Sequence, residues 1–154
     1  PRTHDGPPED SSASVAAAAA DADVICTVTG SPTAILFGRD VRKGTHLCLV
    51  GASIPSSREV DDDLVTLSRY FVDYRGSALA QAGELLEAIK AGRVTEAHIL
   101  GEIGDVLSGS VPGRLAHDDV TVYKSLGVAA QDLVSALLVY RHALERGLGT
   151  VAEL

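Results

Sequence analysis

Short, almost continuously apolar segments, separated by helical patterns, constrain the fold of this chain more than any other feature. The first two are Asp23–Thr29 and His46–Val50, and each is followed by a glycine. Two more follow at Tyr70–Tyr74 and Val120–Ser125. Strands of a parallel sheet are covered on both faces and therefore read as continuous apolar runs. The sequence predicts an α/β fold on a parallel sheet of these four strands, covered on both faces.

The segments between the strands carry helical signals. Acidic residues open Asp61–Arg69, where the helix dipole favours negative charge. The last pattern keeps an i, i+3, i+4, i+7 apolar rhythm and stops at Gly147 and Gly149. The predicted helices are Ala13–Ala22, Asp61–Arg69, Ser77–Ala91 with a soft break at Gly83, Thr95–Leu107, and Val128–Arg146.

Composition excludes several classes of function. The chain of 154 residues carries a net charge of −8 and no basic cluster, which argues against nucleic acid as a partner. It contains no apolar run of the roughly 18 residues that span a bilayer, and the polar start at Pro1–Asp10 does not resemble a signal peptide. We therefore expect a cytoplasmic protein with no membrane or nucleic-acid partner.

The two cysteines, Cys26 and Cys48, lie inside predicted strands and do not form a CxxC motif. The five histidines do not cluster near them, so the sequence predicts no metal site. Free cysteines are usually buried, and we expect both thiols to be reduced and buried.

The stretch Thr45–Leu64 has the form of a ligand loop. A strand runs into Gly51, then a turn of small residues, then an acidic helix start. Parallel sheets present ligand loops at the carboxyl ends of their strands. The sequence contains no GxGxxG turn, and the glycines of residues 101–109 have the wrong spacing for one. Glu102 and Asp105 in that segment are read as structural carboxylates.

Five blocks, taken together, resemble the ornithine cyclodeaminase/mu-crystallin family in order and spacing. Each block alone is a weak signal. The blocks are ADVICTVT (22–29), KGTHLCLVGASIPSSREVDDDLV (43–65), YFVDYRGSALAQAGEL (70–85), LGEIGDVLSGSVPGR (100–114) and DDVTVYKSLGVAAQDLVSALLVYRHALERG (118–147).

The resemblance implies the later half of a Rossmann domain that binds NAD or NADP, in a homodimeric protein. It also implies that the family's N-terminal portion, with its dimerisation strands, substrate-binding cations and first glycine turn, is not in this chain. The implied organisation is a tail at 1–11, a partial NAD(P)-binding domain at 12–127, and a helix at 128–154 that returns toward a dimerisation domain. We expect these 154 residues alone to be inactive.

Three matched motifs imply contacts with the dinucleotide. Thr29 at a strand end is suited to a ribose or phosphate oxygen, or simply to strand-end backbone. Gly51 would let the backbone approach the nicotinamide, or is an ordinary turn glycine. The turn after the last strand would offer exposed N–H groups, and Lys124 alone reads as a solvated lysine. The implied cofactor residues are Thr27, Val28, Thr29, Val50, Gly51, Ala52, Ser53, Lys124, Ser125, Leu126 and Gly127.

Ser53 separates the reactions known in this family. Members that deaminate ornithine carry Asp at the matching position, whereas the mu-crystallin-like members, which reduce cyclic ketimines, carry Ser. A serine hydroxyl cannot serve as a carboxylate base near neutral pH. The resemblance therefore implies an NAD(P)H-dependent reductase of cyclic imino acids. The alternatives are an ornithine cyclodeaminase that recycles NAD and a non-catalytic remnant or small-molecule-binding protein.

Overall fold

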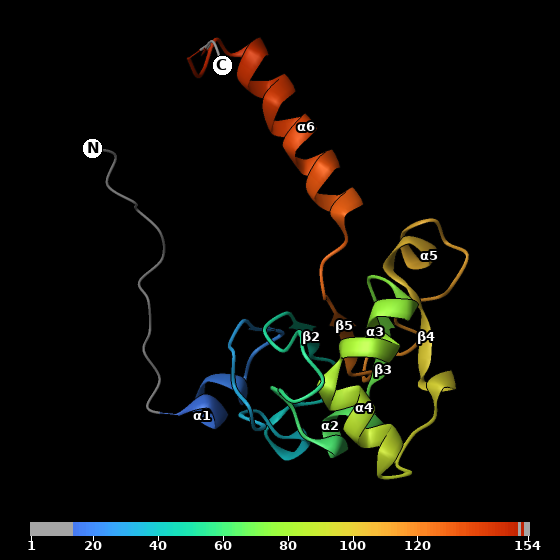
Figure 1. The fold of residues 1–154 in the computed structure, drawn as a ribbon. Helices are drawn as coiled ribbons and strands as arrows, with labels where there is room; N and C mark the ends of the chain where they lie inside the picture. The colour runs from blue at the N-terminus through green and yellow to red at the C-terminus, as the bar shows by residue number, and fades with distance from the viewer. Residues whose placement is uncertain (1–13, 151, 153–154) are drawn as a thin grey trace.

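The computed structural model describes residues 14–150 and 152, and its centre is one sheet of parallel strands (Figure 1). Five strands pair in the order β1-β2-β5-β3-β4, and every pairing is parallel. The predicted α/β class is therefore confirmed, with one strand more than expected. The strands are β1 Val24–Thr27, β2 His46–Leu49, β3 Arg69–Val72, β4 Ile99–Glu102 and β5 Thr121–Lys124.

The helices follow the predicted segments closely except between residues 95 and 107. Asp61 caps α2 by accepting a hydrogen bond from the Leu64 N–H at 3.0 Å, as its place before an acidic first turn suggests. The predicted soft break at Gly83 separates two helices, α3 and α4. The helical elements are α1 Val15–Ala19, η1 Gly38–Asp40, α2 Asp62–Leu67, α3 Arg75–Gln81, α4 Gly83–Lys90, η2 Glu96–His98, α5 Ile103–Leu107 and α6 Ala129–Glu145.

The prediction of one helix over Thr95–Leu107 is wrong, because β4 occupies its middle. Gly101 of β4 pairs with Phe71 of β3, so β4 closes an edge that β3 would otherwise expose. A Cβ at Gly101 would lie 3.2 Å from the Val111 side chain, which packs over the strand. The helical spacing of apolar residues in this segment is real, but pairing with β3 overrides it.

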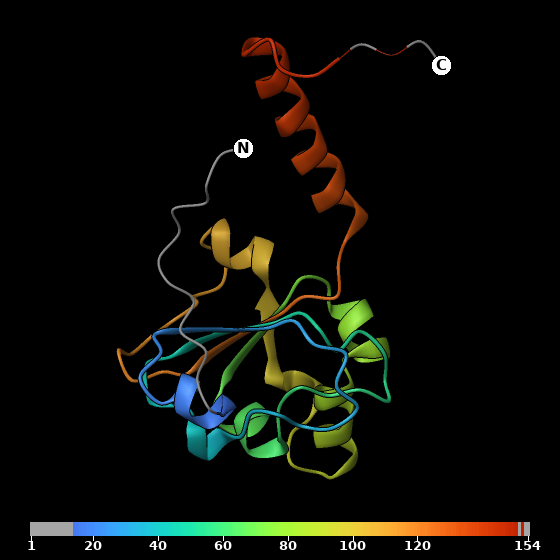
Figure 2. The same ribbon diagram turned by 90° about the vertical axis from the view of Figure 1, so that its left-hand side faces the viewer.

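One face of the sheet carries the core. Leu47, Leu49 and Val122 point to this face and are fully buried. Figure 2 shows α1, α2 and α4 on this side of the sheet and α5 on the other. The predicted burial of apolar strand residues is therefore confirmed for this face.

The opposite face is covered only in part, so the expectation of two covered faces is wrong for β1 and β2. Residues 103–114 lie over β3 and β5, where Phe71 is 5% exposed. No described element covers β1 and β2 on this side, and Cys26 is exposed while Cys48 is partly exposed. The expectation of two buried thiols is wrong for the same reason.

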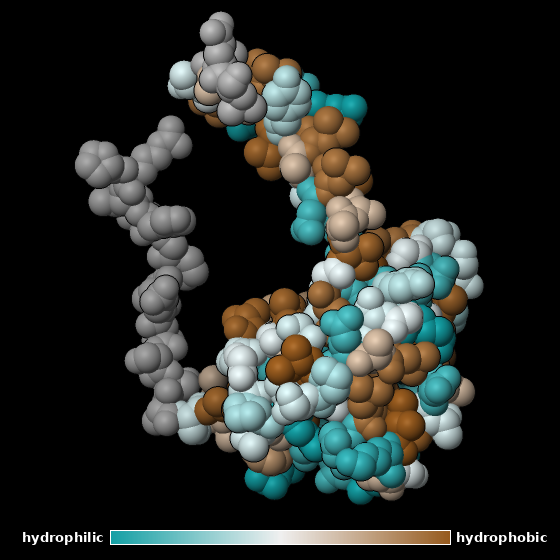
Figure 3. All heavy atoms as spheres, viewed as in Figure 1, coloured by the Kyte–Doolittle hydropathy of each residue, from teal (hydrophilic) through white to brown (hydrophobic). Residues whose placement is uncertain are grey.

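Helix α6 stands away from the sheet and its helices (Figure 1). None of its residues is buried, and Leu133, Leu137 and Leu138 are 70%, 43% and 54% exposed. Figure 3 shows hydrophobic side chains along much of its length. The helix ends before Gly147 as predicted. The tail at 1–11 lies outside the described residues, and the division of the chain at residue 128 stays a prediction. Within residues 14–150, no helix is both long and apolar enough to cross a membrane.

Candidate functional site

The three segments predicted to contact a dinucleotide meet at one edge of the sheet. They follow β1, β2 and β5, which are neighbouring parallel strands, so their carboxyl ends point the same way. The end of β3, at Asp73, adjoins them. A crevice outside the carboxyl ends of parallel strands is where such folds bind ligands.

Glu59 ties the ends of β1 and β2 together. Its carboxylate is fully buried and accepts hydrogen bonds from the Thr27 hydroxyl (2.8 Å), the Thr29 N–H (2.6 Å), the Thr29 hydroxyl (2.8 Å) and the Gly51 N–H (2.8 Å). Burial alone would raise the pKa of Glu59, but these hydrogen bonds outweigh burial and lower the pKa below its ordinary value. Both threonine hydroxyls therefore donate within the protein.

Gly51 is required by the approach of these two strand ends to each other. A Cβ on Gly51 would lie 1.9 Å from the Thr29 carbonyl oxygen and 2.4 Å from Glu59 Oε1, distances that no side chain could occupy. The next residue, Ala52, is fully buried, and Ser53 beyond it is exposed. The segment thus presents Ser53 from a backbone that is held in place on its inner side.

Lys124 holds the same segment from inside the protein, which corrects its interpretation as a solvated lysine. Its side chain is fully buried, with Nζ 3.0 Å from Glu84 Oε1 of α4. Nζ also donates a hydrogen bond to the Ala52 carbonyl. Through this hydrogen bond Lys124 supports the Ala52 backbone, and a direct contact with a cofactor stays a prediction. The same buried Glu84 carboxylate, together with burial, raises the pKa of Tyr70 well above its ordinary value.

Asp73 occupies the backbone N–H groups that were expected to be free in the turn after β5. Its Oδ2 accepts hydrogen bonds from the Leu126 N–H at 2.6 Å and the Gly127 N–H at 2.7 Å, and lies 3.4 Å from the Ser125 hydroxyl. The prediction of exposed N–H groups is therefore wrong for Leu126 and Gly127, because the end of β3 supplies an acceptor.

Sequence reasoning assigned no role to Glu84 and Asp73. Glu84 is a charged residue at a buried position of α4, between the buried Gly83 and Leu85. Asp73 directly follows the buried run of β3 and is itself 7% exposed. A carboxylate at an otherwise apolar position is the signal that would have identified both, because buried carboxylates need hydrogen-bonding or charged partners.

The exposed side chains of the strand ends face away from these anchors. Val28 and Val50 are 72% and 43% exposed, and a Cβ at Gly30 would meet nothing within 4 Å. Val28 and Val50 thus present exposed apolar side chains at the strand ends, and their contact with a dinucleotide stays a prediction. Within residues 14–150, no glycine-rich turn between a strand and a helix is present to cradle a pyrophosphate.

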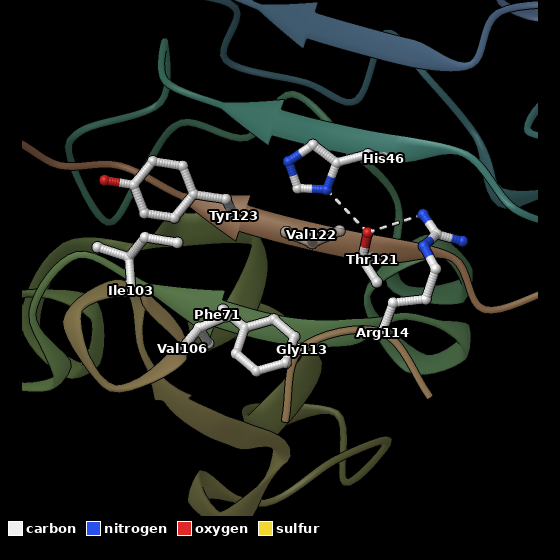
Figure 4. A pocket seen from close by; sticks show the side chains of 9 residues that line it. All are labelled: His46, Phe71, Ile103, Val106, Gly113, Arg114, Thr121, Val122 and Tyr123. Carbon is white, nitrogen blue, oxygen red and sulfur yellow. Dashed lines mark hydrogen bonds between the residues drawn. The ribbon is translucent and has the colours of Figure 1, made fainter. Parts of the chain in front are cut away.

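Two other features of the molecule lie apart from this edge. Glu102 and Asp105 form a capping box at the start of α5, and Glu102 also accepts the Arg75 N–H at 2.9 Å, which confirms their structural interpretation. A cavity of about 340 Å³ on the second sheet face is lined by Phe71, Val106 and Tyr123 among others (Figure 4). In the described part of the chain, no three His, Cys, Asp or Glu side chains are grouped to hold a metal ion.

Known proteins resemble this chain over most of its length. The ketimine reductase mu-crystallin of Mus musculus is 44% identical over 127 residues, which are 82% of this chain and 38% of that protein. The structure of Thermococcus litoralis Δ1-pyrroline-2-carboxylate reductase in complex with NADH and L-proline is 32% identical, with a TM-score of 0.83 over 90% of this chain and 43% of the other. An archaeal alanine dehydrogenase dimer with bound NAD is 30% identical, with a TM-score of 0.74 over 86% and 41%.

The similarity covers this chain well but covers less than half of each relative. The parallel sheet of this chain matches those of the two structures solved with NADH or NAD, and it is a sheet of the Rossmann type. The sequence profile of the ornithine cyclodeaminase/mu-crystallin family matches residues 9–147. On this evidence the chain belongs to the ornithine cyclodeaminase/mu-crystallin family.

Proposed function

We propose that this chain forms part of an NAD(P)H-dependent reductase of cyclic imino acids, such as pyrroline- or piperideine-2-carboxylate. The observation that carries the proposal is Ser53, which stands exposed at the end of a segment anchored by Glu59 and Lys124. Relatives named for ketimine and pyrroline-2-carboxylate reduction support the same reaction.

The residues of this chain would bind and orient one side of the cofactor. A reduced nicotinamide, when bound, supplies a hydride for the C=N carbon of the imine. Val28 and Val50 offer an exposed apolar surface to a flat ring, and the bonds to Glu59 hold that surface in place. A rigid wall of this kind costs little reorganisation when the reactants meet.

Ser53 also bears on the two alternatives. Deamination of ornithine needs a group that moves protons at this position, and a serine hydroxyl cannot do this near neutral pH unless a base activates it. A purely binding role is compatible with the exposed apolar surface at Val28 and Val50 and with the lack of a phosphate-binding turn among the described residues. Assay of the whole protein distinguishes the three possibilities.

The remaining contacts of the reductase belong to portions outside this chain. The chain spans about two fifths of the length of the relatives it matches, namely 38% of the murine protein and 43% of the archaeal reductase structure. We propose a homodimeric, cytoplasmic protein in which α6 packs against a further portion or a partner subunit. The exposed leucines of α6 and the relative described as a dimer support this arrangement.

The test is an assay of the full-length protein that contains this chain, with NADH or NADPH and cyclic imino acids. We expect oxidation of one cofactor molecule for each imine reduced. Release of ammonia from ornithine without net cofactor oxidation would favour the cyclodeaminase, and Ser53→Asp should then raise that activity. No turnover with either substrate would leave the binding role.

A further inference from the structure

The uncovered half of the second sheet face brings both cysteines of the chain together. Cys26 of β1 and Cys48 of β2 are direct register partners on neighbouring parallel strands. Side chains at paired positions point to the same face, and neighbouring strands lie about 4.8 Å apart. Disulfides form between residues whose Cα atoms are about 4.4–6.8 Å apart, so the spacing of paired strands brings the two Cα atoms into this range.

The two thiols differ in accessibility. Cys26 is exposed, whereas Cys48 is partly covered. Burial, with the neighbouring Cys26 thiol, raises the pKa of the Cys48 thiol. Cys26 is thus the thiol that a dissolved oxidant meets first, and Cys48 is positioned to attack second.

His46 adds a proton acceptor beside this pair. Its Nε2 lies 3.6 Å from Cys48 Sγ, and its Nδ1 lies 2.8 Å from the Thr121 hydroxyl, which also accepts from Arg114 at 3.3 Å (Figure 4). Burial and the Arg114 charge lower the pKa of His46, so the ring is neutral near pH 7. In the tautomer that carries its proton on Nδ1, toward the Thr121 hydroxyl, the neutral imidazole can take a proton from Cys48 at Nε2.

We propose that Cys26 and Cys48 form a reversible disulfide that fastens β1 to β2. This redox site is independent of the proposed reductase activity. With a small-molecule disulfide such as oxidised glutathione as the oxidant, the Cys26 thiolate attacks one sulfur and releases one glutathione thiol. Cys26 then carries glutathione in a mixed disulfide. Cys48 loses its proton, attacks the Cys26 sulfur of that mixed disulfide and releases the second glutathione thiol. Two protein thiols are oxidised and one disulfide is reduced to two thiols.

The disulfide would lie close to the strand ends that form the candidate site. Cys26 immediately precedes Thr27, and Cys48 lies two residues before Val50. The disulfide would close a loop of about 20 residues and restrict the unfolded chain, so we expect the midpoint of thermal unfolding to rise by about 5–10 °C on oxidation.

The experiment equilibrates the reduced 154-residue chain with graded ratios of reduced to oxidised glutathione, in native buffer and in denaturant. Mass spectrometry after alkylation then counts free thiols. Because the chain has two cysteines, a monomer with no free thiol and no attached glutathione contains this bond. Cys26→Ser and Cys48→Ser serve as controls that cannot form it.

The expected result is a native chain that forms the bond at a thiol-to-disulfide ratio at least about tenfold more reducing than the denatured chain requires, because folding holds the thiols together. The oxidised chain should keep its far-ultraviolet circular dichroism spectrum. The proposal is overturned if the native chain retains two thiols, forms only glutathione adducts or linked dimers, or forms the bond no more readily than the denatured chain.

Discussion

The two faces of one sheet are built in different ways. On the core face, charged groups are enclosed and paired, as Lys124 and Glu84 are, each with a side chain 0% exposed. On the other face, Cys26 of β1 is exposed, and His46 and Cys48 of β2 are partly exposed. Both faces belong to the same strands, so the difference in burial comes from the elements that cover each face.

This difference shows where the strand-end segments obtain their rigidity. Glu59 and Lys124 hold the segment from Val50 to Ser53 from the core side, while its exposed side chains face outward. Changes on the core side should therefore cost stability and disturb the site. Changes on the open face should be mild, and four sets of variants test this contrast in order of decreasing effect.

The largest effect is expected from breaking the buried ion pair. Lys124→Met leaves Glu84 charged and unpaired in the core, which should lower the free energy of unfolding by about 3–5 kcal/mol. The double variant with Glu84→Leu should recover much of that loss. Urea denaturation measures the free energy of unfolding of both variants.

The control is Lys90→Met, which removes an exposed partner of Glu87 and should change stability by less than about 1 kcal/mol. Equal losses in the two lysine variants would disprove the contrast.

Gly51→Ala is expected to come second. Its Cβ would lie 1.9 Å from the Thr29 carbonyl oxygen, so β1 and β2 must separate at their ends, at a cost of about 2–3 kcal/mol. Gly30→Ala is the matched control, because its Cβ would meet nothing within 4 Å. Thermal or urea unfolding compares the two. A Gly51→Ala chain as stable as Gly30→Ala would show that the two strand ends are not closely held.

Glu59→Gln should cost about 1–2 kcal/mol at pH 7, because an amide accepts fewer of the four hydrogen bonds. The pKa of Glu59 is lowered in the folded state, so its contribution is present above its unfolded pKa and is lost as pH falls through the folded pKa. The difference between the wild-type chain and Glu59→Gln should shrink below about pH 4. Glu87→Gln, at an exposed position, should not alter the acid limb of the profile.

The smallest effect is expected on the open face. The pKa of His46 is lowered by burial and by Arg114, so the folded state favours the neutral ring. That preference is present above the unfolded pKa, and it is lost as pH falls from about 6.5 through the folded pKa. His46→Gln should remove this shallow decline, while His117→Gln, at a fully exposed position, should keep it. If His46→Gln changed the free energy of unfolding by more than Glu59→Gln does, the open face would not be the milder of the two.

The sequence was sufficient for the sheet class, four of the strands and the meeting of three strand-end segments. It was not sufficient for β4, since the apolar spacing of residues 99–107 fits a helix and only pairing with β3 selects the strand. The apolar runs also predict a sheet covered on both faces, which overstates how much of the second face is covered. In fact Leu47, Leu49 and Val122 point to the core. Val24, which is 59% exposed, shares the other face with Cys26 and Cys48.

The anchors were harder to predict than the segments they hold. Lys124 reads as a solvent-facing lysine until Glu84, 40 positions away along the chain, is placed beside it by the packing of α4. Asp73 reaches the turn after β5 only because β3 and β5 are neighbours in the sheet. Such long-range partners follow from topology and not from local pattern.

The proposed hydride transfer to an imino acid beside the Val50–Ser53 segment can be followed with an isotope. The most direct measurement incubates the full-length protein with NADH or NADPH deuterated on the transferred position and with pyrroline-2-carboxylate, followed by mass spectrometry of the proline formed. We expect proline that carries one deuterium at the former imine carbon, in equal amount to the oxidised cofactor. Proline without deuterium, or no proline at all, would contradict it.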